Sequence, residues 1–267
     1  MFLNDETLSV ERRRKGVAWV TINHPPANAI GEELMKDLSQ VAEELSHDQT
    51  VRVIVVTSAH PKIFLAGADL KGMIYSTGNG ETEVEDPIAA QSAKMQACFQ
   101  RFAELPKPVI AAINGHALGG GCEFAMACDF RIMSKGRIGL TELSLGLIPG
   151  AGGTQRMTRL LGRAKALELI FTARQLEPKE AEAVGLITRA VEPDELEAVT
   201  MKFAESLAEG AVHAMGLAKK AINACELPLS EGLAIEAKAF SETFLTDEPS
   251  IGLAAFFQKE KPKFLDE

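Results

Sequence analysis

Short runs of β-branched and aliphatic residues alternate along this chain with stretches in which apolar residues recur at helical spacing. Residues 51–57, 109–113, 130–133 and 137–140 have the length and composition of strands. Residues 31–45 and 91–105, and the stretch that begins at Gly121, have helical periodicity instead. Such alternation is typical of βα units with parallel strands, so the sequence predicts an α/β fold.

The two ends of the chain depart from this alternation. Residues 7–13 and 17–22 are strand-like and are separated by Lys15 and Gly16, which predicts a hairpin. From residue 164 onward the pattern is almost entirely helical, most clearly at residues 211–225 and 229–244. Residues 78–86 concentrate acid and glycine without periodicity, so we expect a mobile surface loop or a short disordered segment there.

Composition restricts the kinds of partner. The 267 residues carry a formal net charge of -9, which disfavours broad electrostatic binding to nucleic acid or an anionic membrane. No apolar stretch approaches the roughly 20 residues that would span a bilayer. The first residues have no apolar core flanked by basic residues and carry three acids, so we expect a cytoplasmic protein.

The cysteines have no spacing of the kind that builds zinc sites or a redox-active loop. We expect reduced and mostly buried thiols, and no metal site, from these four residues: Cys98, Cys122, Cys128 and Cys225.

Two loops that follow buried strands are rich in small residues. The first contains Ala66, Gly67 and Ala68, and the second contains Gly119, Gly120 and Gly121. Small side chains let the backbone approach a ligand closely, and free amides at a helix start favour negative charge. Two such loops facing one cavity would form a two-donor oxyanion hole. The alternative is that each is only a tight strand-to-helix turn.

Two glutamates stand in otherwise apolar stretches. Glu123 directly follows the second loop, and Glu142 lies nineteen positions further on, on a different predicted element. An acid in such a setting is paired, hydrated or functional. Either residue could simply be an acid at a helix start, which the helix dipole favours. Near an oxyanion hole, however, two carboxylates can hold a water molecule and transfer its protons.

These residues resemble the crotonase (enoyl-CoA hydratase/isomerase) superfamily, and the resemblance extends from Asn28 to Phe264. The matching segments are Ala66-Gly67-Ala68-Asp69, residues 108–123, residues 148–156 and residues 255–264. The resemblance implies an α/β spiral of ββα turns, with a helical C-terminal region that mediates trimers, often paired into hexamers. On this basis we predict a spiral catalytic core over residues 1–200 and a helical oligomerisation region over residues 201–267.

The resemblance also assigns roles to single residues. It places the thioester oxygen of an acyl-CoA substrate between the amides of Ala68 and Gly120, with coenzyme A as part of the substrate and no separate cofactor. It implies that the substrate is lined by Pro26, Ala27, Ala66, Ala68, Asp69, Leu70, Lys71 and Gly120. Phe256 and Lys259 are weaker candidates for the nucleotide end, acting across a subunit boundary.

Because both hydratase-type glutamates are present, the implied reaction is syn hydration of a trans-2-enoyl-CoA to a 3-hydroxyacyl-CoA by Glu123 and Glu142. Isomerisation or thioester hydrolysis on the same scaffold, and RNA binding without turnover, are the alternatives. Leu65 and Thr141 depart from the family pattern, where a small residue and a proline are usual. His116 is expected to pack or form hydrogen bonds, and Asp69 and Asp129 to fix loops through backbone amides.

Overall fold

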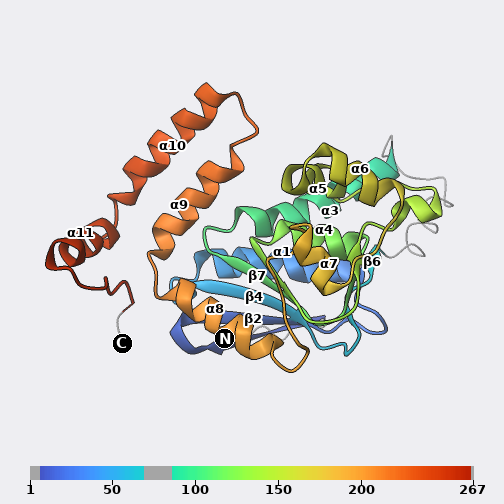
Figure 1. The fold of residues 1–267 in the computed structure, drawn as a ribbon, viewed down its shortest axis with the longest axis horizontal. Coiled ribbons are helices and arrows are strands. Elements are labelled where there is room, and N and C mark those ends of the chain that lie inside the picture. The colour runs from blue at the N-terminus through green and yellow to red at the C-terminus, as the bar shows by residue number, and fades with distance from the viewer. Residues whose placement is uncertain (1–6, 69–85, 266–267) are drawn as a thin grey trace.

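The computed structural model describes residues 7–68 and 86–265 of the chain (Figure 1). Most of the loop predicted at residues 78–86 lies outside these ranges; Asp86, its last residue, accepts a hydrogen bond from the amide of Ala89 at the start of a helix.

The main sheet has six strands in the order β1-β2-β4-β7-β9-β11. Their bounds are β1 Leu8–Arg13, β2 Val17–Ile22, β4 Val53–Ser58, β7 Val109–Ile113, β9 Phe130–Met133 and β11 Arg189–Ala190. The predicted hairpin is confirmed, because β1 and β2 pair antiparallel. Every other neighbouring pair in this sheet is parallel, as the βα alternation predicts.

Shorter strands form a second layer beside the main sheet. β5 (Ile63–Leu65), β8 (His116–Leu118) and β10 (Ile138–Gly139) make a parallel three-stranded sheet in the order β10-β8-β5. β3 (Ala29–Ile30) pairs with β6 (Gly67–Ala68) in the same sense. After the β1–β2 hairpin, each turn of chain gives one strand to the main sheet and one or two to the shorter sheets.

A helix closes each of these turns. These helices are α1 Glu32–His47, α3 Pro87–Glu104, α4 Gly120–Ala127 and α5 Gly153–Leu161. The repeated unit is therefore ββα, and the predicted spiral core is confirmed.

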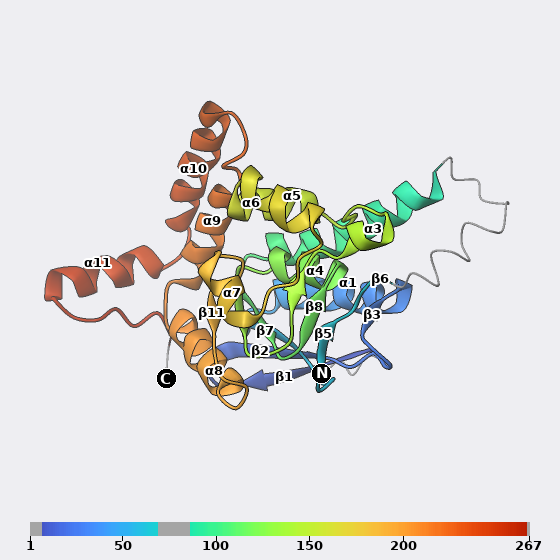
Figure 2. The ribbon, with the colours of Figure 1, turned by 45° about the vertical axis from the view of Figure 1, so that its right-hand side comes forward.

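Helices cover both faces of the main sheet. On one face Phe124 of α4 packs against Phe99 and Phe102 of α3, with ring centroids 5.4 and 5.0 Å apart. On the other face, α8 (Leu196–Ala208) buries its alanines against Val17, Trp19 and Val53 of the sheet. Figure 2 shows α1 and α8 on opposite sides of the strands. The layer that contains Phe124 holds α4 in place, and the α8 layer covers the opposite face of the sheet.

The region after residue 164 is not as uniformly helical as its pattern predicts. It contains α6 (Arg163–Phe171) and α7 (Pro178–Ala183), but Arg189 and Ala190 then join the main sheet beside Ile132 and Met133. A two-residue strand is too short to show a period, and it forms here because the edge of β9 offers free backbone partners. The boundary predicted at residue 200 falls inside α8 and stays a prediction.

The last three helices project from the spiral (Figures 1 and 2). They are α9 Val212–Asn223, α10 Leu229–Thr243 and α11 Glu248–Gln258. α9 is fastened to the core by Lys219, whose Nζ lies 2.8 Å from the Asp129 Oδ2, and by Asn223, which donates to the Ala103 carbonyl over 3.0 Å. A helical C-terminal region is therefore confirmed.

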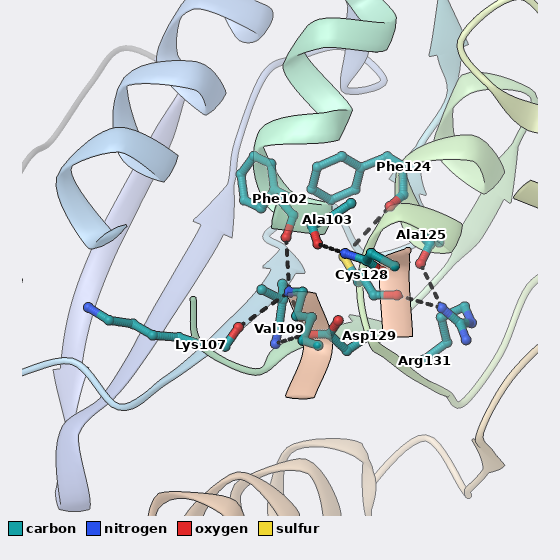
Figure 3. A network of polar contacts seen from close by, with 11 residues as sticks. Phe102, Ala103, Lys107, Val109, Phe124, Ala125, Cys128, Asp129 and Arg131 are labelled. Atoms are coloured by element: carbon teal, nitrogen blue, oxygen red, sulfur yellow. Dashed lines mark hydrogen bonds and ion pairs between the residues drawn. The ribbon is translucent and has the colours of Figure 1, made fainter. Parts of the chain in front are cut away.

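A polar cluster surrounds the point where α9 meets the core (Figure 3). Asp129 accepts a hydrogen bond from the amide of Val109 over 2.7 Å, which confirms the expected link to a backbone amide. Nearby, the buried Arg131 donates to the carbonyls of Ala125, in the last turn of α4, and of Cys128, the residue that follows the helix. A cation at a helix C-terminus satisfies carbonyls that have no partner within the helix, so Arg131 fixes the far end of α4.

Cys98, Cys122 and Cys128 are buried free thiols and Cys225 is exposed, which confirms unpaired and mostly buried cysteines. Within the described ranges, no helix is long and apolar enough to cross a membrane. The same residues contain no group of three or more histidine, cysteine, aspartate or glutamate side chains that could hold a metal ion.

Candidate active site

The two backbone amides that were predicted to form an oxyanion hole lie side by side. Ala68 ends β6, and Gly120 is the first residue of α4. A methyl group built on the Gly120 Cα would lie 3.4 Å from the Ala68 nitrogen. The Gly120 amide belongs to the first turn of α4, where N–H groups have no acceptor within the helix. The structure therefore brings together the two predicted donors.

Glycines make this approach of the two loops possible. Gly67 has φ +99°, which side chains rarely adopt, and a Cβ there would lie 3.0 Å from the Leu118 oxygen. At Gly121 a Cβ would come within 2.2 Å of the Leu65 carbonyl oxygen. Since any side chain at Gly121 would collide with β5, the glycine loop sets how closely α4 approaches β5 and β6.

A buried asparagine holds the first loop from behind. The Asn28 side chain donates to the Ser58 hydroxyl over 2.7 Å and to the Phe64 carbonyl over 3.1 Å. It also accepts a hydrogen bond from the His24 amide over 2.7 Å. Asn28 thereby ties the turn that carries Pro26 and Ala27 to the strands that lead into Ala68.

Glu123 lies in the first turn of α4 and is only 2 % exposed. Its Oε1 accepts hydrogen bonds from the amides of Ala151, over 2.8 Å, and Gly153, over 2.7 Å. Burial is the main cause that raises the pKa of Glu123 to about 7, and the charge of Glu142 adds to it. The two amides and Arg156 act in the opposite direction. Near neutral pH this carboxyl can therefore take up or release a proton.

Glu142 approaches the same turn of α4 from another element. It opens η2 (Glu142–Leu145), and its Oε1 lies 2.9 Å from the position that a Cβ on Gly119 would occupy. The absence of a side chain at Gly119 leaves room for this carboxylate. Burial raises the pKa of Glu142, and its buried Oε2 has no hydrogen-bond partner among the described residues. That oxygen is available to a ligand or a water molecule.

Both glutamates stand at helix starts, which is also what we expect if each is only an acid favoured by the helix dipole. That interpretation accounts for their positions but not for their convergence on one turn of α4. Burial raises the pKa of both acids, and because the charge of Glu142 also raises the pKa of Glu123, the two titrate as a pair. With two amide donors beside them, the arrangement suits acid–base chemistry on a polarised carbonyl compound.

The two departures from the family pattern leave this geometry intact. Leu65 is fully buried in the core, and Thr141 caps η2 with its carbonyl accepting hydrogen bonds from Ser144. His116 forms a hydrogen bond, as expected, through its Nδ1 with the amide of Arg137 over 3.2 Å.

The remaining predicted binding residues are less closely grouped. Pro26 and Ala66 are exposed and Ala27 is half-buried, all in the loops next to β3 and β6. Asp69, Leu70 and Lys71 lie outside the described residues. Phe256 and Lys259 lie on or just after α11, at the opposite end of the chain's fold from β6 (Figures 1 and 2). Within one subunit they are not part of this site.

Sequence reasoning did not single out the amides of Ala151 and Gly153 as partners of Glu123. They belong to the run at residues 148–156, which carried the family resemblance without an assigned role. The signal was its glycine content: Gly152 has φ +103°, and a Cβ on Gly153 would lie 2.8 Å from the Glu123 Oε1. A turn whose glycines leave space for a carboxylate is a candidate for the segment that binds it.

A spiral of ββα units that brings two backbone amides together is the arrangement expected of the crotonase class of proteins. The sequence profile described as enoyl-CoA hydratase/isomerase matches residues 12–267. The chain belongs to this family, within the crotonase superfamily, and is an enzyme of the crotonase type.

Individual relatives agree with that assignment. The chain is 40% identical over 262 residues to a probable enoyl-CoA hydratase of Rhizobium meliloti, with 97% of this chain and 98% of the relative covered. It is 39% identical over 268 residues to the short-chain-enoyl-CoA hydratase of Clostridium acetobutylicum, with 98% and 97% covered. The crystal structure of an enoyl-CoA hydratase from Bacillus anthracis superposes with a TM-score of 0.87 at 37% identity, covering 98% and 100% of the two chains.

Proposed function

We propose that this protein is an enoyl-CoA hydratase, a carbon–oxygen lyase that adds water to trans-2-enoyl-CoA thioesters. The convergence of Glu123 and Glu142 on the turn that carries the Gly120 amide is the observation that supports this reaction most directly. Relatives at about 40% identity bear the name enoyl-CoA hydratase.

The substrate carbonyl accepts hydrogen bonds from the amides of Ala68 and Gly120. These donors stabilise the enolate charge that develops on the thioester oxygen, and losing one would lower the rate on the order of a hundredfold. Both amides are main-chain groups on packed elements, so they need little reorganisation as charge develops.

The two carboxyl groups hold one water molecule and divide the proton transfers. Ionised Glu123 accepts a proton from the water as its oxygen bonds to C3, and protonated Glu142 delivers a proton to C2. A raised pKa suits both roles, because general acids and bases work best with a pKa near the operating pH. The reverse steps dehydrate the 3-hydroxyacyl-CoA.

Residues around the first loop are proposed to bind the coenzyme A portion of the substrate. Pro26 and Ala27, tied down by Asn28, lie next to β3. Ala66, Asp69, Leu70 and Lys71, which stand in or directly after the Ala66-Gly67-Ala68 segment of the sequence, are proposed to bind the same part of the substrate. The chemistry above uses only side chains and amides of this chain, so we expect full activity after dialysis against a metal chelator.

Incubation with crotonyl-CoA tests the proposed function. The ultraviolet absorbance of the conjugated thioester is expected to fall, and mass spectrometry is expected to show an acyl-CoA heavier by one water. An isomer of unchanged mass, or release of free coenzyme A, would instead identify an isomerase or a hydrolase. No conversion of enoyl-CoAs of any chain length would contradict the proposal.

We also infer that copies of this chain associate through the projecting helices, as trimers or dimers of trimers. Large apolar side chains on and beside α10 and α11 are exposed: Leu229 by 78%, Phe240 by 68%, Phe244 by 60% and Phe257 by 77%. An apolar surface of this kind is typical of a subunit interface. Sedimentation velocity is expected to show a trimer or hexamer, and a monomer at micromolar concentration would refute it.

A further inference from the structure

A stripe of polar side chains runs along α3 toward the turn that holds Glu123. Ser92, Gln96, Gln100 and Glu104 recur at intervals of four residues and therefore lie on one face of the helix. The Ser92 hydroxyl donates to the Gly150 carbonyl oxygen over 2.6 Å, and the Gln96 amide donates to the same oxygen over 2.8 Å. One carbonyl oxygen thus accepts two side-chain donors from α3.

The peptide group that these donors hold is the one that contacts Glu123. The Gly150 carbonyl and the Ala151 N–H belong to a single planar trans peptide, so they point in opposite directions. With its oxygen fixed by α3, this peptide directs its N–H to the Glu123 Oε1, 2.8 Å away. Hydrogen bonds to the carbonyl also polarise the amide and make its N–H a stronger donor.

We propose that Ser92 and Gln96 are positioning residues for Glu123: by holding the Gly150 carbonyl, they aim and strengthen the Ala151 amide that stabilises the Glu123 carboxylate. This inference deepens the proposed function, in which Glu123 acts as the base. Neither side chain contacts the reacting atoms, and their effect passes through one peptide group.

Other charged or titratable groups around Glu123 come from three elements. Glu142 of η2 raises the pKa of Glu123, and Arg156 of α5 lowers it. Arg156 is itself held by the same stripe, because its guanidinium donates to the Gln100 Oε1 over 2.6 Å. Cys122, beside Glu123 on α4, has its pKa raised by burial and stays a neutral thiol. Substitution at Ser92 and Gln96 leaves all of these groups in place.

The test is a Ser92→Ala/Gln96→Met double variant, which removes both donors while keeping similar side-chain volume. The ionisation of Glu123 is followed by infrared spectroscopy, using the carboxyl band that disappears in Glu123→Gln. We expect the titration to move to higher pH by roughly half a unit or more, because a weakened donor stabilises the carboxylate less. The acid limb of the pH profile of kcat/KM should move with it, so the loss of activity is larger at pH 6.5 than at pH 9.

Two further variants serve as controls. Ser92→Thr keeps the hydroxyl and should titrate like the parent protein, which separates donor loss from altered packing. Gln40→Met on α1 removes an exposed glutamine that donates a hydrogen bond to Glu44, and it should change neither readout. Gln96→Met alone changes an exposed side chain and serves if the double variant does not fold.

An unchanged Glu123 titration in the double variant would overturn the positioning role. This infrared readout needs no turnover, so it remains decisive if the parent protein hydrates no enoyl-CoA and the proposed function fails. If kcat/KM instead falls equally at all pH values while the Glu123 titration is unchanged, Ser92 and Gln96 have only a structural role.

Discussion

At the scale of single residues, Glu123 is held in an environment that opposes its charge. Its side chain is 2 % exposed and shares its surroundings with Glu142, while two amides and Arg156 partly compensate. The net result is a pKa near 7 in place of the ordinary 4.5. Above neutral pH the buried, charged carboxylate lowers the stability of the fold. The same environment gives Glu123 a pKa that suits a base working at neutral pH.

Glu123→Gln is therefore expected to stabilise the protein in a pH-dependent way. The folded state keeps the Glu123 proton up to about pH 7, whereas the unfolded chain releases it near 4.5. The stabilising contribution of this proton is complete below pH 4.5 and is lost as pH rises through 7. The variant should thus gain up to about 3 kcal/mol at pH 8 and little near pH 4.5.

Thermal unfolding at the two pH values measures this difference. Glu182→Gln, at an exposed position on α7, is the control and should behave like the parent at both. Equal destabilisation of Glu123→Gln at pH 8 and at pH 4.5 would contradict the description of Glu123 as a buried acid with a raised pKa.

At the scale of elements, close backbone contacts define the site. α4 approaches β5 so nearly that a methyl group on Gly121 would lie 2.2 Å from the Leu65 oxygen. This contact sets the depth of the helix start, and with it the position of the Gly120 amide. Position 121 therefore requires glycine because there is no space for a side chain, and not because the backbone has an unusual φ.

Gly121→Ala is expected to cost about 1–3 kcal/mol of stability and to impair any activity that depends on the Gly120 amide. Chemical denaturation gives the first quantity and turnover of crotonyl-CoA the second. Gly232→Ala on α10 is the matched control, since its new methyl would meet the Ala224 oxygen at an ordinary 3.5 Å. Parent-like stability of Gly121→Ala would show that α4 and β5 are not in firm contact.

Elements with a strong local pattern could be predicted from sequence, and elements made by tertiary contact could not. Residues 109–113 and 130–133 are strands with the bounds that their short apolar stretches predict. The two-residue strands β3, β6 and β11 have no period of their own and form only beside a partner. The same holds for the site: Glu123 and Glu142 stand out as acids in apolar runs, whereas Ser92 lies 58 residues from Gly150 and carries no local signal.

At the scale of the whole molecule, the projecting helices are fastened to the spiral by a small number of polar contacts. Lys219 and Asp129 have side chains only 11% and 22% exposed and are paired at 2.8 Å. Figure 3 shows Asp129 close to Val109 and to the ends of the segments that carry Phe102 and Ala103. A partly buried pair at such a junction is costly to break by removing one partner.

Lys219→Met should leave Asp129 without its cation and lower stability by about 2–4 kcal/mol. Asp129→Asn in the same chain should recover part of this loss, because no uncompensated charge then remains. Lys220→Met, which breaks a more exposed pair with Glu242, should change stability by less than about 0.5 kcal/mol. Equal effects of the two lysine variants in denaturant unfolding would disprove a special role for the Asp129 pair.

The central claim is that Glu123 and Glu142 together supply the acid–base chemistry of hydration beside the Ala68 and Gly120 amides. The most direct measurement is the kcat for crotonyl-CoA hydration by Glu123→Gln and Glu142→Gln, with coenzyme A affinity measured for each. Both variants should lose orders of magnitude in kcat while binding coenzyme A nearly as the parent does. A near-normal kcat in either one would remove that residue from the chemistry and contradict the account.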